Sequence, residues 1–274
     1  KEVAMTRKAS LGLGLAGCLL LAGCFDVEQT LVLQKDLSGK AGFTMKVDME
    51  PMVYMMVMMQ RGMEGKEGEP TAAEIEKAKQ DFLASKKTEG APDTEKQKAE
   101  LAQSLPPGVK LLDSRFEDEG LKLLASFALG FDDLEKLRQV SLSPKPAEGE
   151  SAEAEQAPAG PAGQNPFDTP FGDLEVLDQG GFLLLTSKAR NPLEEQKQEM
   201  GGEGEISPDM EKQLEQAFKG LRIAWKIEAP FPVVEHNAHR QEGKTLIWEY
   251  TLDSLKTMDP KKANEGIRVK YKKS

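Results

Sequence analysis

The sequence predicts an α+β protein in which a curved antiparallel sheet, built from several hairpins, is packed by amphipathic helices. Two observations predict this class. Apolar and polar residues alternate along several short segments, and stretches with helical spacing lie between those segments. Alternation with period two and one polar face is typical of half-buried strands in antiparallel sheets. Apolar residues three and four positions apart indicate helices with one buried side.

The strands are expected in pairs, because turn residues separate them. Alternation is cleanest over residues 43–49, 221–227, 246–252 and 267–271. A first hairpin is predicted around the turn at 36–42, with Leu31 and Leu33 on its first strand. Two more hairpins are predicted over 109–129, turning at 117–120, and over 174–187, turning at Gly180-Gly181.

Helices are expected between the hairpins. Thr71 and Glu74 have the spacing of a capping box, and apolar residues follow at helical positions. Pro51 fits the first position of a helix, where a missing N–H costs least. Three further helices are predicted over residues 93–105, 132–140 and 207–220.

One central segment differs in composition from the rest of the chain. Residues 143–170 are rich in Pro, Ala, Gly and Glu, and they hold almost no large apolar side chain. Such a segment does not bury enough surface to offset the entropy of ordering it. We therefore expect one α+β domain over residues 24–257 with a flexible insertion at about 143–170, followed by a basic strand or tail over 258–274.

The first residues have the order of an export signal. Arg7 and Lys8 precede an apolar run that ends in small residues before Cys24. The run is about 13 residues long, whereas a helix that spans a bilayer needs roughly 20. Residues 1–23 are therefore expected to be a signal peptide rather than a membrane anchor.

The end of this segment, Leu21-Ala22-Gly23-Cys24, resembles the lipobox of bacterial lipoproteins. That resemblance implies cleavage before Cys24, a diacylglycerol on its sulfur and a fatty acyl chain, such as palmitate, on its new amine. Two or three acyl chains hold a protein firmly to a membrane, at about 0.8 kcal/mol per buried methylene. Once the leader is removed with Cys18, Cys24 is the only cysteine, so no disulfide within the chain is expected.

Charge narrows the classes of partner. The 274 residues carry a formal net charge of −10. Binding to nucleic-acid phosphates calls for a basic face, so no nucleic-acid partner is expected. The basic residues after Lys256 could meet anionic lipid headgroups, or they could simply be solvated.

The arrangement as a whole resembles the LppM-like lipoproteins, a bacterial family in which a lipobox precedes an α+β envelope domain. An early hairpin follows the cysteine at Val27–Met49, and a late block combines a strand at Leu221–Pro230, the pair Asn237-Ala238 and a Trp-bearing strand at Leu246–Leu252. The resemblance implies an exported domain that binds lipids or glycolipids, and it implies no catalytic residue. Family members often end in an apolar helix, whereas this sequence ends in Tyr271-Lys272-Lys273-Ser274.

The most unusual local feature is a run of methionines. Eight of the 12 methionines lie between Met45 and Met63. On a helix that starts at Pro51, one stripe would hold Met52, Met55, Met56, Met59 and Met63. A helix that is apolar all round is buried or meets a lipid or a partner. Because methionine adapts to varied apolar surfaces, this stripe is a candidate wall of a ligand-binding groove; a plain core role and a thioether site for Cu(I) are the alternatives.

Other candidate residues give weaker signals. Trp225 and Trp248 lie on the apolar phase of two strands, where they would line a ligand cavity or fill the core. His236 and His239 are the only histidines, and two ligands do not make a metal site, so no metal or other cofactor is expected. We find no nucleophile elbow, phosphate-binding glycine loop or Cys–His pair, so no catalytic residue is assigned and no enzyme is expected.

These observations lead to a functional hypothesis. We expect a lipid-anchored protein of the bacterial cell envelope that binds a lipid or lipid-like ligand without catalysis. The alternative is a structural or assembly lipoprotein whose methionine segment docks a protein partner of the envelope. Phe25, rather than Asp, follows the cysteine, which resembles the outer-membrane default of some Gram-negative lipoproteins.

Overall fold

A computed structural model describes residues 24–66, 68–89, 94–141, 170–187, 219–259, 262 and 265–273. Three predicted segments lie outside these residues: the signal peptide at 1–23, the insertion at 143–170 apart from Pro170, and the helix at 207–220 apart from its last two residues. The domain boundaries that depend on them stay predictions.

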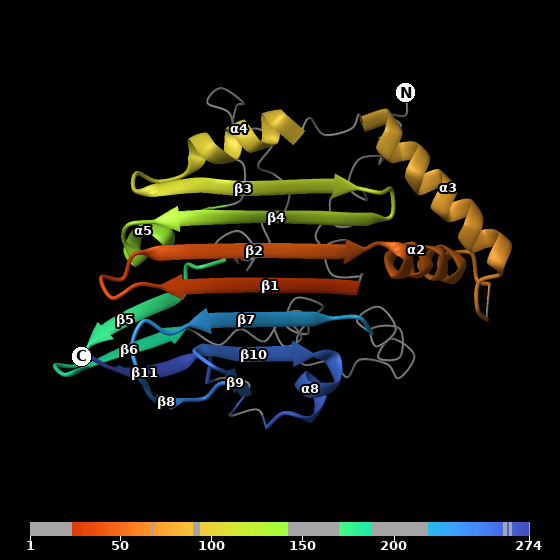
Figure 1. The fold of residues 1–274 in the computed structure, drawn as a ribbon. Helices are drawn as coiled ribbons and strands as arrows, with labels where there is room; N and C mark the ends of the chain where they lie inside the picture. The colour runs from red at the N-terminus through yellow and green to blue at the C-terminus, as the bar shows by residue number, and fades with distance from the viewer. Residues whose placement is uncertain are drawn as a thin grey trace, which may run out of the picture.

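The described residues form the predicted α+β fold, with two sheets that share a core (Figure 1). The larger sheet has seven strands in the order β3-β4-β2-β1-β7-β10-β9, and the smaller has four in the order β5-β6-β11-β8. The strands of the larger sheet are β1 (Cys24–Leu33), β2 (Gly39–Asp48), β3 (Val109–Asp118), β4 (Lys122–Phe131), β7 (Arg222–Glu228), β9 (Arg240–Glu242) and β10 (Thr245–Thr251). Those of the smaller sheet are β5 (Leu174–Asp178), β6 (Phe182–Ser187), β8 (Val233–His236) and β11 (Arg268–Lys272).

All three predicted hairpins are present. Strands β1 and β2, β3 and β4, and β5 and β6 pair antiparallel through short turns. Gly120 and Gly180 have φ values of 79° and 74° at two of these turns, a conformation that glycine adopts without steric cost. Local turn chemistry therefore favours the β3–β4 and β5–β6 hairpins.

The centre of the larger sheet joins segments that are far apart in sequence. β1 pairs antiparallel with β2 on one side and parallel with β7 on the other, with Asp26 opposite Arg222. This parallel pair is an exception to the antiparallel sheet that the alternation predicted. It makes β1 the strand that connects the N-terminal hairpin to the C-terminal strands.

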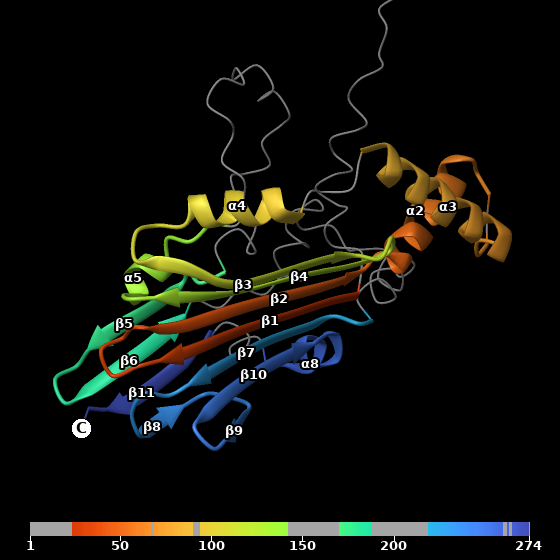
Figure 2. The ribbon, with the colours of Figure 1, turned by 45° about the horizontal axis from the view of Figure 1, so that its top comes forward.

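The described helices lie around the larger sheet. They are α2 (Glu50–Met63), α3 (Ala72–Glu89), α4 (Thr94–Ser104), α5 (Leu134–Leu137) and α8 (Leu252–Thr257). Figures 1 and 2 show α2 and α3 at the end of the sheet where β1 begins, the smaller sheet at the end where β1 finishes, and α4 along the edge strand β3. The predicted capping box begins α3, because Thr71 and Glu74 exchange hydrogen bonds.

The core consists of two apolar clusters. The main cluster lies between the two sheets and includes Leu31, Leu129, Leu185, Val269 and Tyr271. The second cluster lies at the α2 end and holds Phe25, Val47, Met52, Leu221 and Leu252. Met45 packs against both clusters and so connects them along the inner face of the sheet.

Candidate functional site

A row of mostly aromatic side chains crosses the inner face of the larger sheet, which is the face that packs on the core. Cross-strand register sets its order from β3 to β10. The row, which we call the aromatic row although two of its members are polar, consists of Ser114, Phe127, Phe43, Gln29, Trp225 and Trp248. Phe43 and Phe127 stack with ring centroids 5.2 Å apart, and Trp225 meets Phe171 edge to face at 6.1 Å.

A polar residue sits in the middle of this apolar surface. Gln29 lies between Phe43 and Trp225, and only 6% of its surface is exposed. Its Oε1 has no hydrogen-bond partner among the residues that the structure describes, and the same holds for the buried Oγ of Ser114. A buried acceptor left unpaired costs about 1–3 kcal/mol, so each such atom calls for an explanation.

The next row towards α2 is less buried. It consists of Phe116, Ala125, Met45, Val27, Ile223 and Tyr250. All of these residues except Val27 are half-buried, and so is the neighbouring Trp225. We call the six residues from Phe116 to Tyr250 the half-buried row. It gives Gln29 an apolar neighbourhood whose side chains, Val27 apart, are partly exposed.

The methionine segment forms the predicted helix, and its stripe divides in two. Met52 belongs to the second cluster and Met55 packs against it, as Met45 and Ile223 of the half-buried row also do. Met56, Met59 and Met63 are exposed instead. The structure therefore brings two of the five stripe methionines into the apolar surface that extends to Trp225, and it places the other three on the outside.

The two tryptophans have different surroundings. Trp248 is fully buried, and its Nε1 donates to Oδ1 of Asn237 at 3.0 Å. The same oxygen accepts from the backbone N–H of Arg268 at 2.9 Å, which joins the larger sheet to β11. The indole N–H of Trp248 is thus hydrogen-bonded inside the core. Trp225 is half-buried, and in the aromatic row it lies directly beside Gln29.

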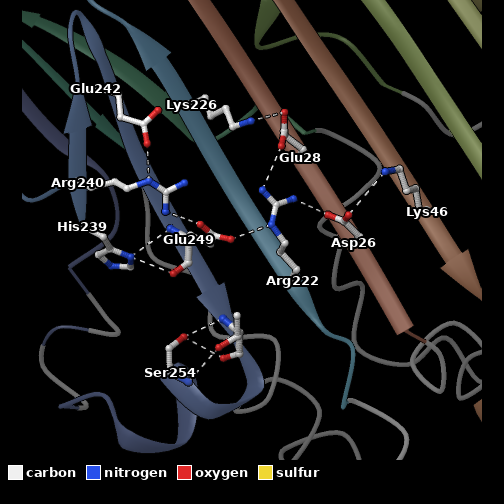
Figure 3. Close-up of polar contacts among 11 residues, drawn as sticks. Asp26, Glu28, Lys46, Arg222, Lys226, His239, Arg240, Glu242, Glu249 and Ser254 are labelled. Carbon is white, nitrogen blue, oxygen red and sulfur yellow. Dashed lines mark hydrogen bonds and ion pairs between the residues drawn. The ribbon is translucent and has the colours of Figure 1, made fainter.

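The opposite, outer face of the sheet carries a network of charges (Figure 3). At its centre, the Arg222 guanidinium bonds three carboxylates: Asp26 at 2.6 Å, Glu249 at 2.9 Å and Glu28 at 3.2 Å. Lys226 also bonds Glu28 at 2.8 Å, and Arg240 bonds Glu249 at 2.6 Å. The network therefore connects β1, β7, β10 and β9 across the sheet.

The pKa values of this network are shifted away from neutral pH, downward for the carboxylates Glu28 and Glu249 and upward for Arg222. Hydrogen bonds from Arg240 and Arg222 lower the pKa of Glu249. Burial would raise the pKa of Glu28, but bonds from Lys226 and Arg222 outweigh burial and lower it. Burial likewise opposes the positive charge of Arg222, but its three carboxylates raise its pKa. A general acid or base works best with a pKa near the operating pH. The pKa values of these groups are shifted the other way, which favours permanently charged ion pairs that hold the strands together.

Each of the two histidines contacts the backbone of a different residue. His236 ends β8 and its Nδ1 accepts from the backbone N–H of Ala238, while the Nδ1 of His239 lies 2.9 Å from the backbone oxygen of Glu249. Within the described ranges, no group of three His, Cys, Asp or Glu side chains is placed to hold a metal ion. Over the same residues, no helix combines the length and the apolar character that crossing a bilayer requires.

A surface hollow of about 490 Å³ lies at the far end of β1 and β7. Its walls come from the β1–β2 turn and from the residues that follow β7: Leu33, Gln34, Lys35, Asp36, Glu228, Ala229, Pro230 and Lys244. The hollow is open and mostly polar, and none of the predicted ligand-binding residues lines it.

Comparisons with known proteins give matches among solved structures only. No family model matches the sequence, and no curated protein matches it. Among solved structures, the chain is similar to the folded domain of LppM from Mycobacterium tuberculosis, determined by NMR, with 10% identity over 92% of each chain and a TM-score of 0.39.

Gln29 was missed by the sequence analysis, although a signal for it exists. Phe25, Val27, Leu31 and Leu33 alternate along β1, and Gln29 takes the apolar phase between them. A polar residue in the buried phase of a strand is unusual enough to mark a site. Two of the three partners of Arg222, Asp26 and Glu28, left no such signal, because they lie almost 200 positions away in the sequence.

Proposed function

We propose that this chain is a lipid-anchored protein of the bacterial cell envelope that binds a lipid or lipid-like ligand and performs no covalent chemistry on it. One observation carries the ligand proposal: the buried Oε1 of Gln29 lacks a described partner in the middle of an apolar surface. Ligand sites are typically apolar, with a few placed polar groups that orient the ligand.

The chemistry around Gln29 suits an amphipathic molecule. A hydroxyl or amide of the ligand would donate to Gln29 Oε1 and relieve its unpaired state. An acyl or similar apolar chain would lie along the half-buried row, against Met45, Ile223 and Tyr250. Met52 and Met55 would line its end, where flexible thioether side chains adapt to chains of different shape.

The tether is proposed from the N-terminal residues. The lipobox-like Leu21-Ala22-Gly23-Cys24 supports acylation of Cys24, and Phe25 after it supports sorting to an outer membrane where the host has one. Cys24 is also the first residue of β1, so the lipid would attach directly to the sheet. Two or three acyl chains are sufficient for stable anchoring.

A protein partner is the second candidate. It is favoured by the exposure of Met56, Met59 and Met63, since exposed apolar side chains that cluster often mark interaction sites. That candidate requires no bound small molecule, so the ligand experiment below separates the two.

Native mass spectrometry tests the ligand. The chain would be produced from position 24 onward as the Cys24→Ser variant, which keeps the core residue Phe25. We expect a reproducible added mass after gentle purification from bacteria, lost in organic solvent and identified as a lipid. A clean apo mass from several hosts would contradict ligand binding and favour the protein partner.

Gln29→Leu tests the polar contact. We expect a drop in affinity for the captured lipid of up to about tenfold, since one hydrogen bond contributes about 0.5–1.5 kcal/mol. Folding stability should hold or rise, because the variant removes an unpaired buried acceptor. The matched control is Gln34→Leu, the same change at an exposed position of the β1–β2 turn. Equal retention of lipid in both variants would remove Gln29 from the site.

Cys24→Ser tests the tether in the full-length precursor. We expect labelled fatty acid to enter the wild-type protein in growing bacteria and to be absent from the variant. The measurement is incorporation of a radioactive or clickable acyl group into the purified band. Undiminished labelling of the variant would rule out Cys24 as the attachment point.

A further inference from the structure

Exposure rises steadily along the methionine stripe of α2. Met52 is 4% exposed, Met56 37%, Met59 55% and Met63 75%. These residues lie on one side of the helix, because they are spaced three or four positions apart. The helix therefore carries one apolar stripe from the second cluster out into solvent as it leaves the domain.

The stripe lies at the end of the sheet where the proposed tether begins. Cys24 pairs with Asp48, and α2 starts two residues later at Glu50. Figures 1 and 2 show α2 beside the start of β1, away from the smaller sheet. Because β1 begins at Cys24 itself, acyl chains on that residue would hold this end of the domain close to the bilayer.

Charged groups beside the stripe are held in pairs. Arg61 bonds Glu74 of α3 at 2.7 Å, and Lys79 of α3 bonds Glu50 at 3.1 Å. The backbone N–H of Thr71, its hydroxyl and Arg61 lower the pKa of Glu74 to about 2. These contacts pack α3 on the flank of α2, and paired charges approach a membrane interface at lower cost than isolated ones.

We infer that Met56, Met59 and Met63 enter the headgroup–acyl boundary of the bilayer and fix the tethered domain with its α2 end towards the membrane. The inference rests on the tether of the proposed function and adds an orientation to it. An apolar helix side buries about 5–10 Å into this boundary in proteins that lie on membranes. The position of Cys24 selects a lipid surface over a protein as the occupant of the stripe.

The experiment places a single reporter on the mature lipoprotein. Met63→Cys would be labelled with an environment-sensitive NBD dye in the full chain, processed and lipidated by a bacterial host. The protein would then be reconstituted in vesicles of phosphatidylethanolamine and phosphatidylglycerol, with and without doxyl-labelled lipid. The matched control is Leu177→Cys on β5, an exposed apolar residue (49%) at the opposite end of the molecule.

We expect a blue shift and strong doxyl quenching for the dye at Met63, and neither effect at Leu177. Quenching at shallow rather than deep doxyl positions would support a boundary location. A Met63 dye that stays as polar and unquenched as the Leu177 dye would overturn the orientation.

The two proposals fail in different ways. If Cys24 is acylated, each variant carries one free thiol and takes up one dye, because Cys18 leaves with the leader. Uptake of a second dye would mark an unmodified Cys24 and overturn the tether. One dye per chain without quenching would leave the tether in place and overturn the orientation alone.

Discussion

Replacing Trp248 with alanine is expected to lower the free energy of unfolding by about 4 kcal/mol, within the range for truncating a fully buried tryptophan. Trp248 has no exposed surface and packs in the main cluster between the sheets. The change removes the indole volume and the hydrogen bond to Asn237. Urea unfolding followed by the fluorescence of Trp225, the other tryptophan, and by circular dichroism would measure the loss.

A second substitution separates the two contributions. Trp248→Phe keeps most of the apolar volume and drops the N–H donor, so we expect a smaller loss of about 1–2 kcal/mol. Asn237 Oδ1 would retain the backbone N–H of Arg268, which limits the cost. Val32→Ala at an exposed position of β1 is the control and should stay within about 0.5 kcal/mol of wild type. A loss below about 1 kcal/mol for Trp248→Ala would exclude a core role for this residue.

This result would assign different roles to two residues that the sequence treats alike. Trp225 and Trp248 are cross-strand partners, and both fall on the apolar phase of alternating strands. Alternation identifies the face on which a residue lies, but it does not say how much of that face a second sheet covers. The burial of these two residues therefore differs: Trp248 is enclosed beside Asn237, whereas Trp225 is half-buried beside Gln29.

The same limit explains which parts of the fold were predictable. Hairpins such as β3–β4 and β5–β6 follow from neighbouring strands and a local turn, so the sequence pattern was sufficient. The parallel pairing of β1 with β7 and the separation into two sheets depend on contacts between distant segments. A single sequence carries no local signal for them, because apolar alternation is the same whichever strand lies alongside.

The candidate site was predictable in part. The methionine helix and both tryptophan strands were identified from composition and phase. The division of the stripe into Met52 and Met55 inside and Met56, Met59 and Met63 outside needed the position of α2 at the sheet end. The outer-face network was not predicted, because Arg222 looks like any solvated residue of a half-buried strand until β1 is placed beside it.

Arg222→Gln is expected to lower the free energy of unfolding by about 2 kcal/mol at neutral pH, between the values typical of exposed and buried ion pairs. The guanidinium is about a quarter exposed and bonds three carboxylates. Without it, Glu28 keeps Lys226 and Glu249 keeps Arg240, so the loss stays below that of an isolated buried pair. Arg115→Gln, which breaks an exposed pair with Glu117 on β3, is the matched control and should cost less than about 0.5 kcal/mol.

The stability difference between the wild type and Arg222→Gln is expected to shrink as the pH falls. In the folded state, Arg240 and Arg222 lower the pKa of Glu249 below its ordinary value of 4.5. Burial would raise the pKa of Glu28, but Lys226 and Arg222 outweigh it and lower this pKa below 4.5 as well. The resulting stabilisation is fully present above pH 4.5 and disappears as the pH falls through the lowered values. Denaturation of wild type and variant along an acid series should therefore converge below pH 4.5, and added salt should reduce the gap at neutral pH. A gap that persists unchanged into acid would mean that Arg222 stabilises the sheet through the packing of its side chain on β1 and β10 rather than through its charge.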